Sequence, residues 1–362
     1  MRVLHVAECI GGVDVFLRVL LKYSSCENVM ILSQLYNIDE YKEIAHNIEV
    51  MHMEHKISIA AICEAKALRK RIKKYKPDIV YAHSSIAGAV ARMACIGLGV
   101  KVVYNPHGWA FNMDGRNQKV YVALERIMSH FCDAIICISE AERESAMKKK
   151  ICKKDKLHVI YNGIDIENYR NEEVEMPIPQ GAFVVGMVGR ICKQKAPDIF
   201  VEMASEVNKR IKNVFYVIVG DVLEGEEQDR KEIEELARQR GINLYITGWV
   251  KNPMAFMSKF DIGCLLSRWE GFGLVIPEYM LAGIPIVATR VDAIPYLISD
   301  NINGLLVNKD DWKGASEKII ELYSNKQKQR EMIKNGLTTV KERFDAKRVA
   351  LEYECLYDEL VR

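Results

Sequence analysis

The chain has 362 residues, of which 49% are hydrophobic and 28% charged; this composition is typical of folded globular proteins, and this length exceeds one ordinary core. The net charge of +2 gives no overall bias toward nucleic acid or membrane. The ten cysteines are irregularly spaced and form no CxxC pair, which argues against a structural zinc site and a secreted disulfide framework.

Apolar, β-rich runs alternate with helical patterns along the chain, which predicts parallel sheets joined by crossover helices. The first expected strand, Val3–Ala7, follows Met1 and Arg2 directly, so no secretion leader is predicted. No apolar run reaches the ~20 residues that span a bilayer, so we expect a cytoplasmic protein with, at most, peripheral membrane contact. The other strands expected in the first half are Val29–Leu32, Glu49–His52, Asp78–His83, Val102–Tyr104, Ala134–Ile138 and His158–Tyr161.

A polar, proline-bearing stretch at residues 171–181 is predicted to be a linker. The alternation restarts after it, with strands expected at Phe183–Val188, Val214–Val219, Leu244–Thr247, Ile262–Leu266, Ile286–Ala288 and Leu305–Val307. We therefore predict an α/β protein of two doubly wound, Rossmann-like domains, residues 1–170 and 182–344, which face each other across a cleft. Ligands should bind at the carboxyl ends of the strands. Residues 345–362 form an amphipathic pattern typical of a helix, with Val349, Leu356 and Leu360 on one stripe.

The most informative segment is residues 260–289. A buried strand is expected to end at Ser267, and a helix to begin around Gly273–Leu274, where free first-turn amides and the helix dipole suit a diphosphate. Glu270 and Glu278 are eight positions apart, at most ~12 Å along a helix, which matches the sugar and ribose ends of a nucleotide sugar. In isolation, such a pair is more often two solvated glutamates on a structural turn.

This segment resembles the glutamate-seven-glutamate motif of glycosyltransferase family 4, a large retaining family with the GT-B fold. Other features of that family occur in the same order along nearly the whole chain: Gly11-Gly12, His107-Gly108, Tyr161-Asn162-Gly163-Ile164-Asp165, Gly189-Arg190 with Lys195, Gly220, and Thr247-Gly248-Trp249-Val250. None of these motifs identifies the family by itself, but their combination is specific to it. The resemblance implies an acceptor-side N-terminal domain, a C-terminal domain that binds the nucleotide sugar, and a final helix, 345–362, that packs on the N-terminal domain.

The resemblance also implies a role for each matching residue. The expected catalytic residues are Arg190, Lys195, Glu270 and His107. The expected donor-binding residues are Gly11, Gly12, Gly189, Trp249, Val250, Gly271, Phe272, Gly273, Leu274 and Glu278. Asn162 and Asp14 are expected near the acceptor or the sugar. By the same resemblance Glu278 holds the ribose hydroxyls and Glu270 faces the donor sugar, while His107 contacts that sugar without acting as a base.

Arg190 and Lys195 also suit a diphosphate for physical reasons. Arginine offers a planar fork to phosphate oxygens and lysine a compact charge, and both would stabilise the charge that develops on a departing nucleoside diphosphate. Considered alone, two cations at a helix start are more often surface residues. Because the sequence contains no DxD triplet, we expect no metal and no other cofactor, with the nucleotide sugar, most often UDP-linked in this family, as co-substrate.

The chain departs from the family pattern at three places. Ala196 stands where glycine is frequent, Asp14 where glutamate is common, and Val291–Pro295 where a double glycine is usual. None of these changes removes an expected ligand, but the loop near Asp292 should differ in shape.

Two basic runs, Lys66–Lys76 and Lys148–Lys156, are either solvated surface or contacts for anionic lipid headgroups, to which each nearby cation contributes ~1 kcal/mol. For the membrane contact we expect Lys66–Lys76. Nucleic acid is not an expected partner, because neither run carries an aromatic platform or a recognised binding motif.

The leading prediction is a retaining glycosyltransferase that moves a hexose or N-acetylhexosamine to a lipid-linked or other cell-surface saccharide. A sugar-nucleotide 2-epimerase would share the fold, but it should have a late histidine, and none follows His158. A nicotinamide-dependent oxidoreductase is disfavoured because residues 10–14 lack GxGxxG. The third alternative is a degenerate sugar-binding partner, which turnover of a nucleotide sugar would distinguish.

Overall fold

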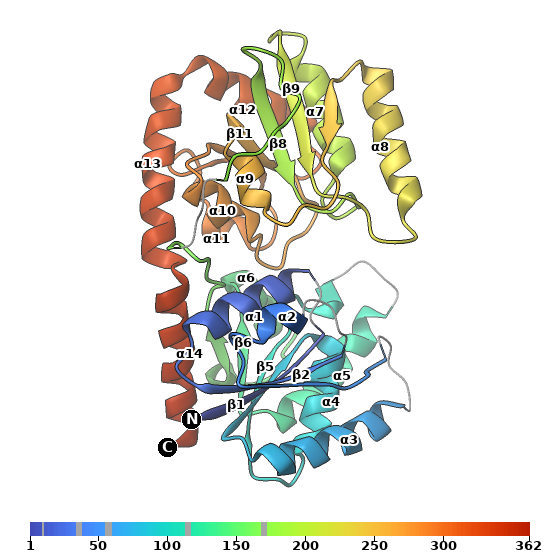
Figure 1. Ribbon diagram of the computed structural model, residues 1–362, viewed down its shortest axis with the longest axis vertical. Helices are drawn as coiled ribbons and strands as arrows, with labels where there is room; N and C mark the ends of the chain where they lie inside the picture. The colour runs from blue at the N-terminus through green and yellow to red at the C-terminus, as the bar shows by residue number, and fades with distance from the viewer. Residues whose placement is uncertain (9–10, 34–37, 55–59, 113–116, 168–171) are drawn as a thin grey trace. The chain divides into compact units, whose positions relative to one another are not determined.

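The computed structural model describes residues 1–8, 11–33, 38–54, 60–112, 117–167 and 172–362. It divides into two compact units (Figure 1): Met1–Asp165 together with Phe344–Arg362, and Ile166–Arg343. The predicted linker therefore falls within the second unit, where residues 172–181 contain no helix or strand. Residue 171, like Ile10 of the first glycine turn, lies outside the described residues.

The first unit is built on a seven-stranded parallel sheet with the order β3-β2-β1-β4-β5-β6-β7. Its strands are β1 (Arg2–Ala7), β2 (Glu27–Leu32), β3 (Asn47–Val50), β4 (Ile79–His83), β5 (Lys101–Asn105), β6 (Ala134–Cys137) and β7 (Leu157–Val159). Its helices are α1 (Gly12–Tyr23), α2 (Ile38–Tyr41), α3 (Ala60–Tyr75), α4 (Ser85–Cys95), α5 (Gln118–Met128), α6 (Glu140–Lys148) and α14 (Ala346–Val361). Helices cover both faces of such a sheet, so its central strands are continuous apolar runs; all five residues of β4 are buried.

Helix α14 belongs to the first unit although it ends the chain (Figure 1). The Ile164 amide donates to the Phe344 carbonyl at 2.8 Å, and the Ala346 amide donates back to the Ile164 carbonyl at 3.0 Å. Val349 and Tyr353 are then buried in the core that α1 and β1 share. The final helix thus packs on the N-terminal domain, as predicted.

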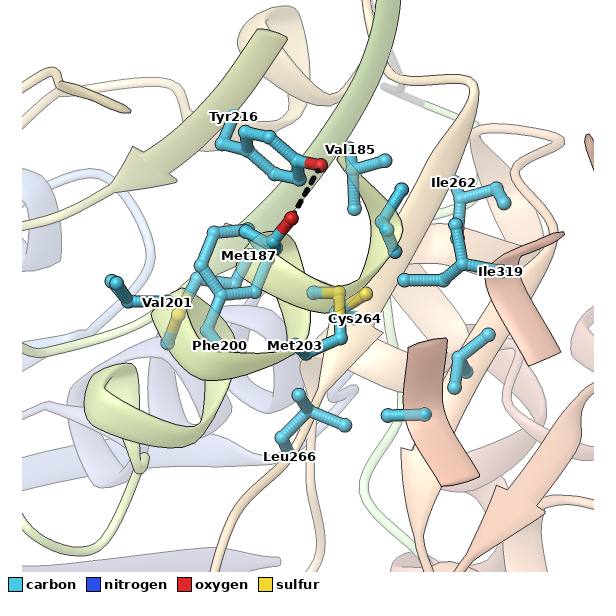
Figure 2. Close-up of a cluster of buried hydrophobic side chains, with 14 of the residues drawn as sticks. Val185, Met187, Phe200, Val201, Met203, Tyr216, Ile262, Cys264, Leu266 and Ile319 are labelled. Carbon is cyan, nitrogen blue, oxygen red and sulfur yellow. Dashed lines mark hydrogen bonds between the residues drawn. The ribbon is translucent and has the colours of Figure 1, made fainter. Parts of the chain in front are cut away.

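The second unit has a six-stranded parallel sheet with the order β10-β9-β8-β11-β12-β13. Its strands are β8 (Phe183–Val188), β9 (Val214–Val219), β10 (Leu244–Ile246), β11 (Ile262–Leu265), β12 (Ile286–Thr289) and β13 (Leu305–Val307). Its helices are α7 (Pro197–Val207), α8 (Glu227–Arg240), α9 (Pro253–Met257), α10 (Val275–Leu281), α11 (Ile294–Leu297), α12 (Trp312–Ser324) and α13 (Lys326–Arg343). Figure 2 shows the core between sheet and helices, where Phe200 of α7 and Ile319 of α12 meet Met187 and Cys264 of the strands.

Strands β1–β13 correspond one to one to the thirteen predicted strands. Both sheets are parallel throughout. Within the described part of the chain, every helix is too short or too polar to cross a membrane.

Candidate active site

The sheet of the second unit changes direction between β8 and β11. From β8 the chain builds outward to β9 and β10, and it then returns to place β11 on the other side of β8. Parallel sheets bind ligands at such a switch point, beyond the carboxyl ends of the two strands. The loop after β8 carries Gly189, Arg190 and Lys195, and the loop after β11 carries Glu270, so the expected catalytic residues of this unit share one position in the topology.

Lys195 and Glu270 are in direct contact although they lie 75 residues apart. The Lys195 Nζ is 2.5 Å from Glu270 Oε1, and the Ser267 hydroxyl donates to the same oxygen at 2.7 Å. The Glu270 amide donates to the Asp292 carboxylate at 2.9 Å. Asp292, in the loop that departs from the family pattern, therefore holds the turn that carries Glu270.

Arg190 differs from Lys195 in its surroundings. Its side chain is exposed, and it makes no hydrogen bond or ion pair with any residue in the described ranges. All five N–H donors of a guanidinium form a planar fork, so this group is available to an anionic ligand. Lys195 and Arg190 thus place one ion-paired and one exposed cation on the same loop.

Steric constraints require glycine at two positions around this loop. Gly189 and Gly220 both have positive φ, 151° and 139°, and a Cβ on Gly220 would lie 2.2 Å from the Gly189 carbonyl oxygen. The turns after β8 and β9 therefore touch backbone to backbone, which only glycine permits at this distance. This contact sets the path of the chain into Arg190.

The segment after Glu270 leads into α10, which begins at Val275 with Leu274 as N-cap, one or two residues later than predicted. Phe272 is buried, and Gly273 has φ 87°, a conformation that favours glycine. Glu278 lies in the first turn of α10 and is half-buried. Burial raises the pKa of its carboxyl to about 7, an effect that the nearby Lys195 ammonium partly opposes.

Trp249 and Val250 follow β10 at the same end of the sheet. The indole Nε1 of Trp249 donates to the Val222 carbonyl at 3.0 Å, yet most of the side chain is exposed. The indole is thus anchored through its nitrogen while most of the residue stays exposed, an arrangement suited to stacking on a planar base.

In the first unit, Gly11 caps α1 with φ 60° and Gly12 is the first residue of that helix. Asp14, in the first turn, is buried; its carboxylate accepts from Arg18 Nε at 3.0 Å and from the Tyr41 hydroxyl at 2.8 Å. These contacts give Asp14 a structural role in holding α1 and α2.

The predicted Asn162–Asp165 turn docks the final helix. A Cβ on Gly163 would lie 2.7 Å from the Ala346 Cα, so α14 approaches the turn more closely than any side chain would permit. Asp165 accepts from Lys22 Nζ at 2.5 Å and from the Tyr23 hydroxyl at 2.6 Å. Asn162 is buried, and its Oδ1 has no hydrogen-bond partner among the described residues.

His107 follows β5 and belongs to a hydrogen-bonded chain of histidines. Its Nε2 is 3.0 Å from His83 Nδ1, and the His83 Nε2 is 3.2 Å from His5 Nδ1. The His5 Nε2 is in turn 3.2 Å from Asn28 Oδ1. His5 and His83 were not among the predicted site residues, because nothing in their spacing along the sequence relates them to His107.

Two family models match the chain. The model for Glycosyltransferase Family 4 matches residues 10–168, and that for Glycosyl transferases group 1 matches residues 168–339. A UDP-Gal:alpha-D-GlcNAc-diphosphoundecaprenol alpha-1,3-galactosyltransferase of Escherichia coli is 30% identical over 294 residues, 76% of this chain and 75% of that protein. The chain belongs to glycosyltransferase family 4.

This glycosyltransferase is also 29% identical, over 343 residues and 90% of each chain, to an uncharacterized 41.2 kDa protein in the cps region of Klebsiella pneumoniae. The crystal structure of Anabaena HepE in complex with UDP and glucose matches 99% of both chains with a TM-score of 0.86 at 21% identity. The predicted fold class is therefore confirmed, and the family sets aside the oxidoreductase and epimerase alternatives.

The half-buried carboxyl of Glu278 predicts a stability that depends on pH. Its folded-state pKa of about 7 exceeds that of an unfolded glutamate, so ionising it as pH rises from about 4.3 to 7 costs folding free energy. Glu278→Gln removes this cost. Each pKa unit corresponds to about 1.4 kcal/mol, and partial exposure reduces this value. We therefore expect the free energy of unfolding of the ligand-free variant at pH 8 to exceed that of the unmodified protein by roughly 1–2 kcal/mol.

Urea unfolding of the Glu278→Gln variant at pH 8 and pH 4.5 measures this difference. The gain should be largest at pH 8 and shrink toward pH 4.5, where the carboxyl is protonated in the folded state and only about half ionised in the unfolded state. Glu224→Gln, at an exposed position, is the matched control and should change neither value. A gain of equal size at both pH values would contradict the assignment to Glu278.

Proposed function

We propose that this glycosyltransferase transfers a hexose or N-acetylhexosamine from a UDP-linked donor to a lipid-linked or other cell-surface saccharide, with retention of the anomeric configuration and without a metal ion. The observation that supports this most is the contact of Lys195 with Glu270 at the switch point, on the same loop as the exposed Arg190. Two cations on one loop suit a diphosphate, and a carboxylate held beside them suits the hydroxyls of the attached sugar.

Each residue has a distinct part in this proposal. Arg190 and Lys195 neutralise the diphosphate as the bond between its oxygen and the anomeric carbon breaks. Glu270 accepts hydrogen bonds from the donor sugar, and Glu278 from the ribose. The exposed indole of Trp249 contacts the base.

In the transfer step, the acceptor oxygen forms its bond to the anomeric carbon on the face that the diphosphate leaves. The acceptor proton passes to the departing phosphate oxygen, so His107 need not act as a base. Its low pKa, about 3 because of burial, agrees with a neutral ring that contacts the sugar.

Two similar proteins support the proposed classes of donor and acceptor. The E. coli relative bears a name that specifies a UDP-Gal donor and a diphosphoundecaprenol acceptor, and the Anabaena structure contains UDP and glucose. The absence of a DxD triplet from the sequence, together with the two cations, supports charge neutralisation by side chains.

The test is a panel of UDP-, GDP- and ADP-sugars, each incubated with the enzyme and a short-chain diphospholipid saccharide in EDTA. We expect turnover of one or more UDP-sugars, and an α-linked product from an α-linked donor by NMR. Turnover only of other nucleotides, a β-linked product, or activity that EDTA abolishes and Mg²⁺ restores would each overturn the corresponding part of the proposal.

We also propose that the enzyme contacts anionic lipid, through a surface other than the one predicted. In the Lys66–Lys76 run, on α3, Arg71 and Lys74 both bind Glu49, and Arg69 donates to the carbonyl oxygens of Ala94 and Ile96. Three of the seven cations in this run are thus already engaged by the protein.

Helix α5 offers a better membrane surface. Val120, Leu124 and Ile127 of this helix are exposed, and their spacing places them on one stripe over successive turns. Phe131, in the short 3-10 turn Ser129–Phe131 that follows, is also exposed. The Arg126 guanidinium donates to the Lys149 carbonyl at 2.5 Å, which brings the basic 148–150 segment beside the helix. An apolar stripe flanked by cations is the pattern of a helix that lies in the interface of an anionic bilayer.

The double variant Val120→Glu/Ile127→Glu is expected to weaken binding to phosphatidylglycerol vesicles by at least about tenfold, because each aliphatic side chain that leaves the lipid costs ~1.5 kcal/mol or more. The two side chains are 55% and 59% exposed, so folding should be unaffected. Vesicle co-sedimentation is the measurement. Ile62→Glu, at a 52% exposed position on α3, is the matched control. If only this variant loses vesicle binding, the membrane contact lies on α3 and not on α5.

A further inference from the structure

The histidine chain crosses four neighbouring strands in their spatial order. Asn28 lies on β2, His5 on β1 and His83 at the end of β4, and His107 follows β5. Asn28 is paired with Val3, and Tyr81 with His5. Because side chains alternate between the faces of a strand, Asn28, His5 and His83 all point to one face, so the register itself aligns the chain.

That face is covered by apolar and aromatic side chains of α1 and α14. The Phe16 ring is centred 5.0 Å from the ring of His107 and 6.1 Å from that of His83. Burial lowers the pKa of His5 to about 4 and that of His83 well below its ordinary value. At neutral pH all three imidazoles are therefore uncharged, and each has one N–H donor and one acceptor nitrogen.

The hydrogen bonds then determine which nitrogen of each ring carries the proton. Asn28 Oδ1 can only accept, so the His5 Nε2 donates and the His5 Nδ1 accepts. The His83 Nε2 must donate to that nitrogen, which leaves the His83 Nδ1 as an acceptor. The His107 Nε2 consequently donates to His83. The His107 Nδ1 is left with a lone pair and has no hydrogen-bond partner within the described ranges.

The backbone of His107 is held separately from its ring. Its amide donates to Asn105 Oδ1 at 3.0 Å, and the Asn105 Nδ2 donates to the Tyr81 hydroxyl at 3.1 Å. His107 itself has φ 51°, in the left-handed region that non-glycine residues seldom adopt. A strained backbone held by a buried asparagine, and a ring held by two further histidines, leave His107 one defined orientation.

We propose that Asn28, His5 and His83 are positioning residues that hold His107 as the Nε2–H tautomer, so that its Nδ1 accepts a hydrogen bond from a hydroxyl of the donor sugar. The inference rests on the proposed function for the identity of that hydroxyl. The tautomer itself depends only on the chain of hydrogen bonds, and a reversed chain would make His107 Nδ1 a donor.

The direct test is two-dimensional NMR of the ¹⁵N-histidine-labelled enzyme without ligand, with the His107 signals assigned by their loss in His107→Gln. We expect a protonated Nε2 and an unprotonated Nδ1 for His107 at neutral pH. A protonated Nδ1 would overturn the proposal. Because no donor is present, this result is independent of whether UDP-sugars are the substrates.

A variant then tests the link to binding. Asn28→Leu matches the side chain in size but cannot accept from His5, so we expect His107 to become a mixture of tautomers. We expect kcat/KM for the UDP-sugar that the enzyme turns over to fall about tenfold, the effect of one lost hydrogen bond. UDP affinity should be unchanged, because the nucleotide lacks the sugar.

The matched control is His46→Gln. His46 accepts from the Asn28 amide through Nδ1 at 3.1 Å but takes no part in the chain, so His107 should keep its tautomer and kcat/KM should stay within a few-fold of its normal value. A folded Asn28→Leu protein that keeps both the Nε2–H tautomer and normal kcat/KM would overturn the proposal. If this variant does not fold, the measurement on the unmodified enzyme still decides the tautomer.

Discussion

Replacing Lys195 by alanine is expected to lower turnover of the donor by about 10²–10³-fold, the usual effect of removing one preorganised group from a developing negative charge. The Lys195 Nζ is 2.5 Å from Glu270 Oε1, so the change removes a cation from the proposed diphosphate site and leaves a buried carboxylate unpaired. The measurement is kcat at saturating donor, together with thermal unfolding to show that the fold persists.

Two further variants separate phosphate binding from the loss of the ion pair. Arg190→Ala should reduce kcat to a similar degree without lowering stability, because Arg190 has no partner within the described ranges. Lys193→Ala removes an exposed cation from the same loop and should change kcat by no more than a few-fold. Near-normal activity of both Lys195→Ala and Arg190→Ala would place the diphosphate elsewhere.

Leu356→Ala in the final helix is expected to destabilise the first unit by about 2–5 kcal/mol, as for other buried leucines. Leu356 is 5% exposed and lies in the same core cluster as Phe16 and Tyr81. Because α14 completes a core that begins at the other end of the chain, truncation after Phe344 should prevent this unit from folding. Urea unfolding measures the effect of the point variant.

The same helix provides the control. Leu351→Ala makes the same chemical change at a position that is 61% exposed, so its effect should stay within about 0.5 kcal/mol. Equal effects of the two variants, or a chain truncated after Phe344 that retains its stability and activity, would contradict the packing of α14.

The strands could be predicted from the sequence because their signal is local. A strand buried on both faces of a parallel sheet is a short, uninterrupted apolar run, and Val214–Val219 of β9 is identical in the prediction and in the structure. The candidate residues of the second unit could be recognised because glycine, arginine, lysine and glutamate keep their spacing within two short segments, residues 189–195 and 270–278.

The contacts between those segments could not be read from the sequence. Lys195 meets Glu270 because β8 and β11 are neighbours, and strand order depends on packing across the whole unit. The same holds for His5, His83 and His107, which looked unrelated until the register of β1, β4 and β5 aligned them.

Exposure was likewise decided only by the tertiary structure. The sequence predicts a membrane contact for the basic run of α3, and only the structure shows that Glu49, on β3, binds two of its cations. The apolar stripe of α5 has the periodicity of a helix that packs on a core, yet it is exposed. Periodicity determines that a helix has an apolar face; whether another element covers that face depends on residues far away in the chain, and so does the pairing of a charge.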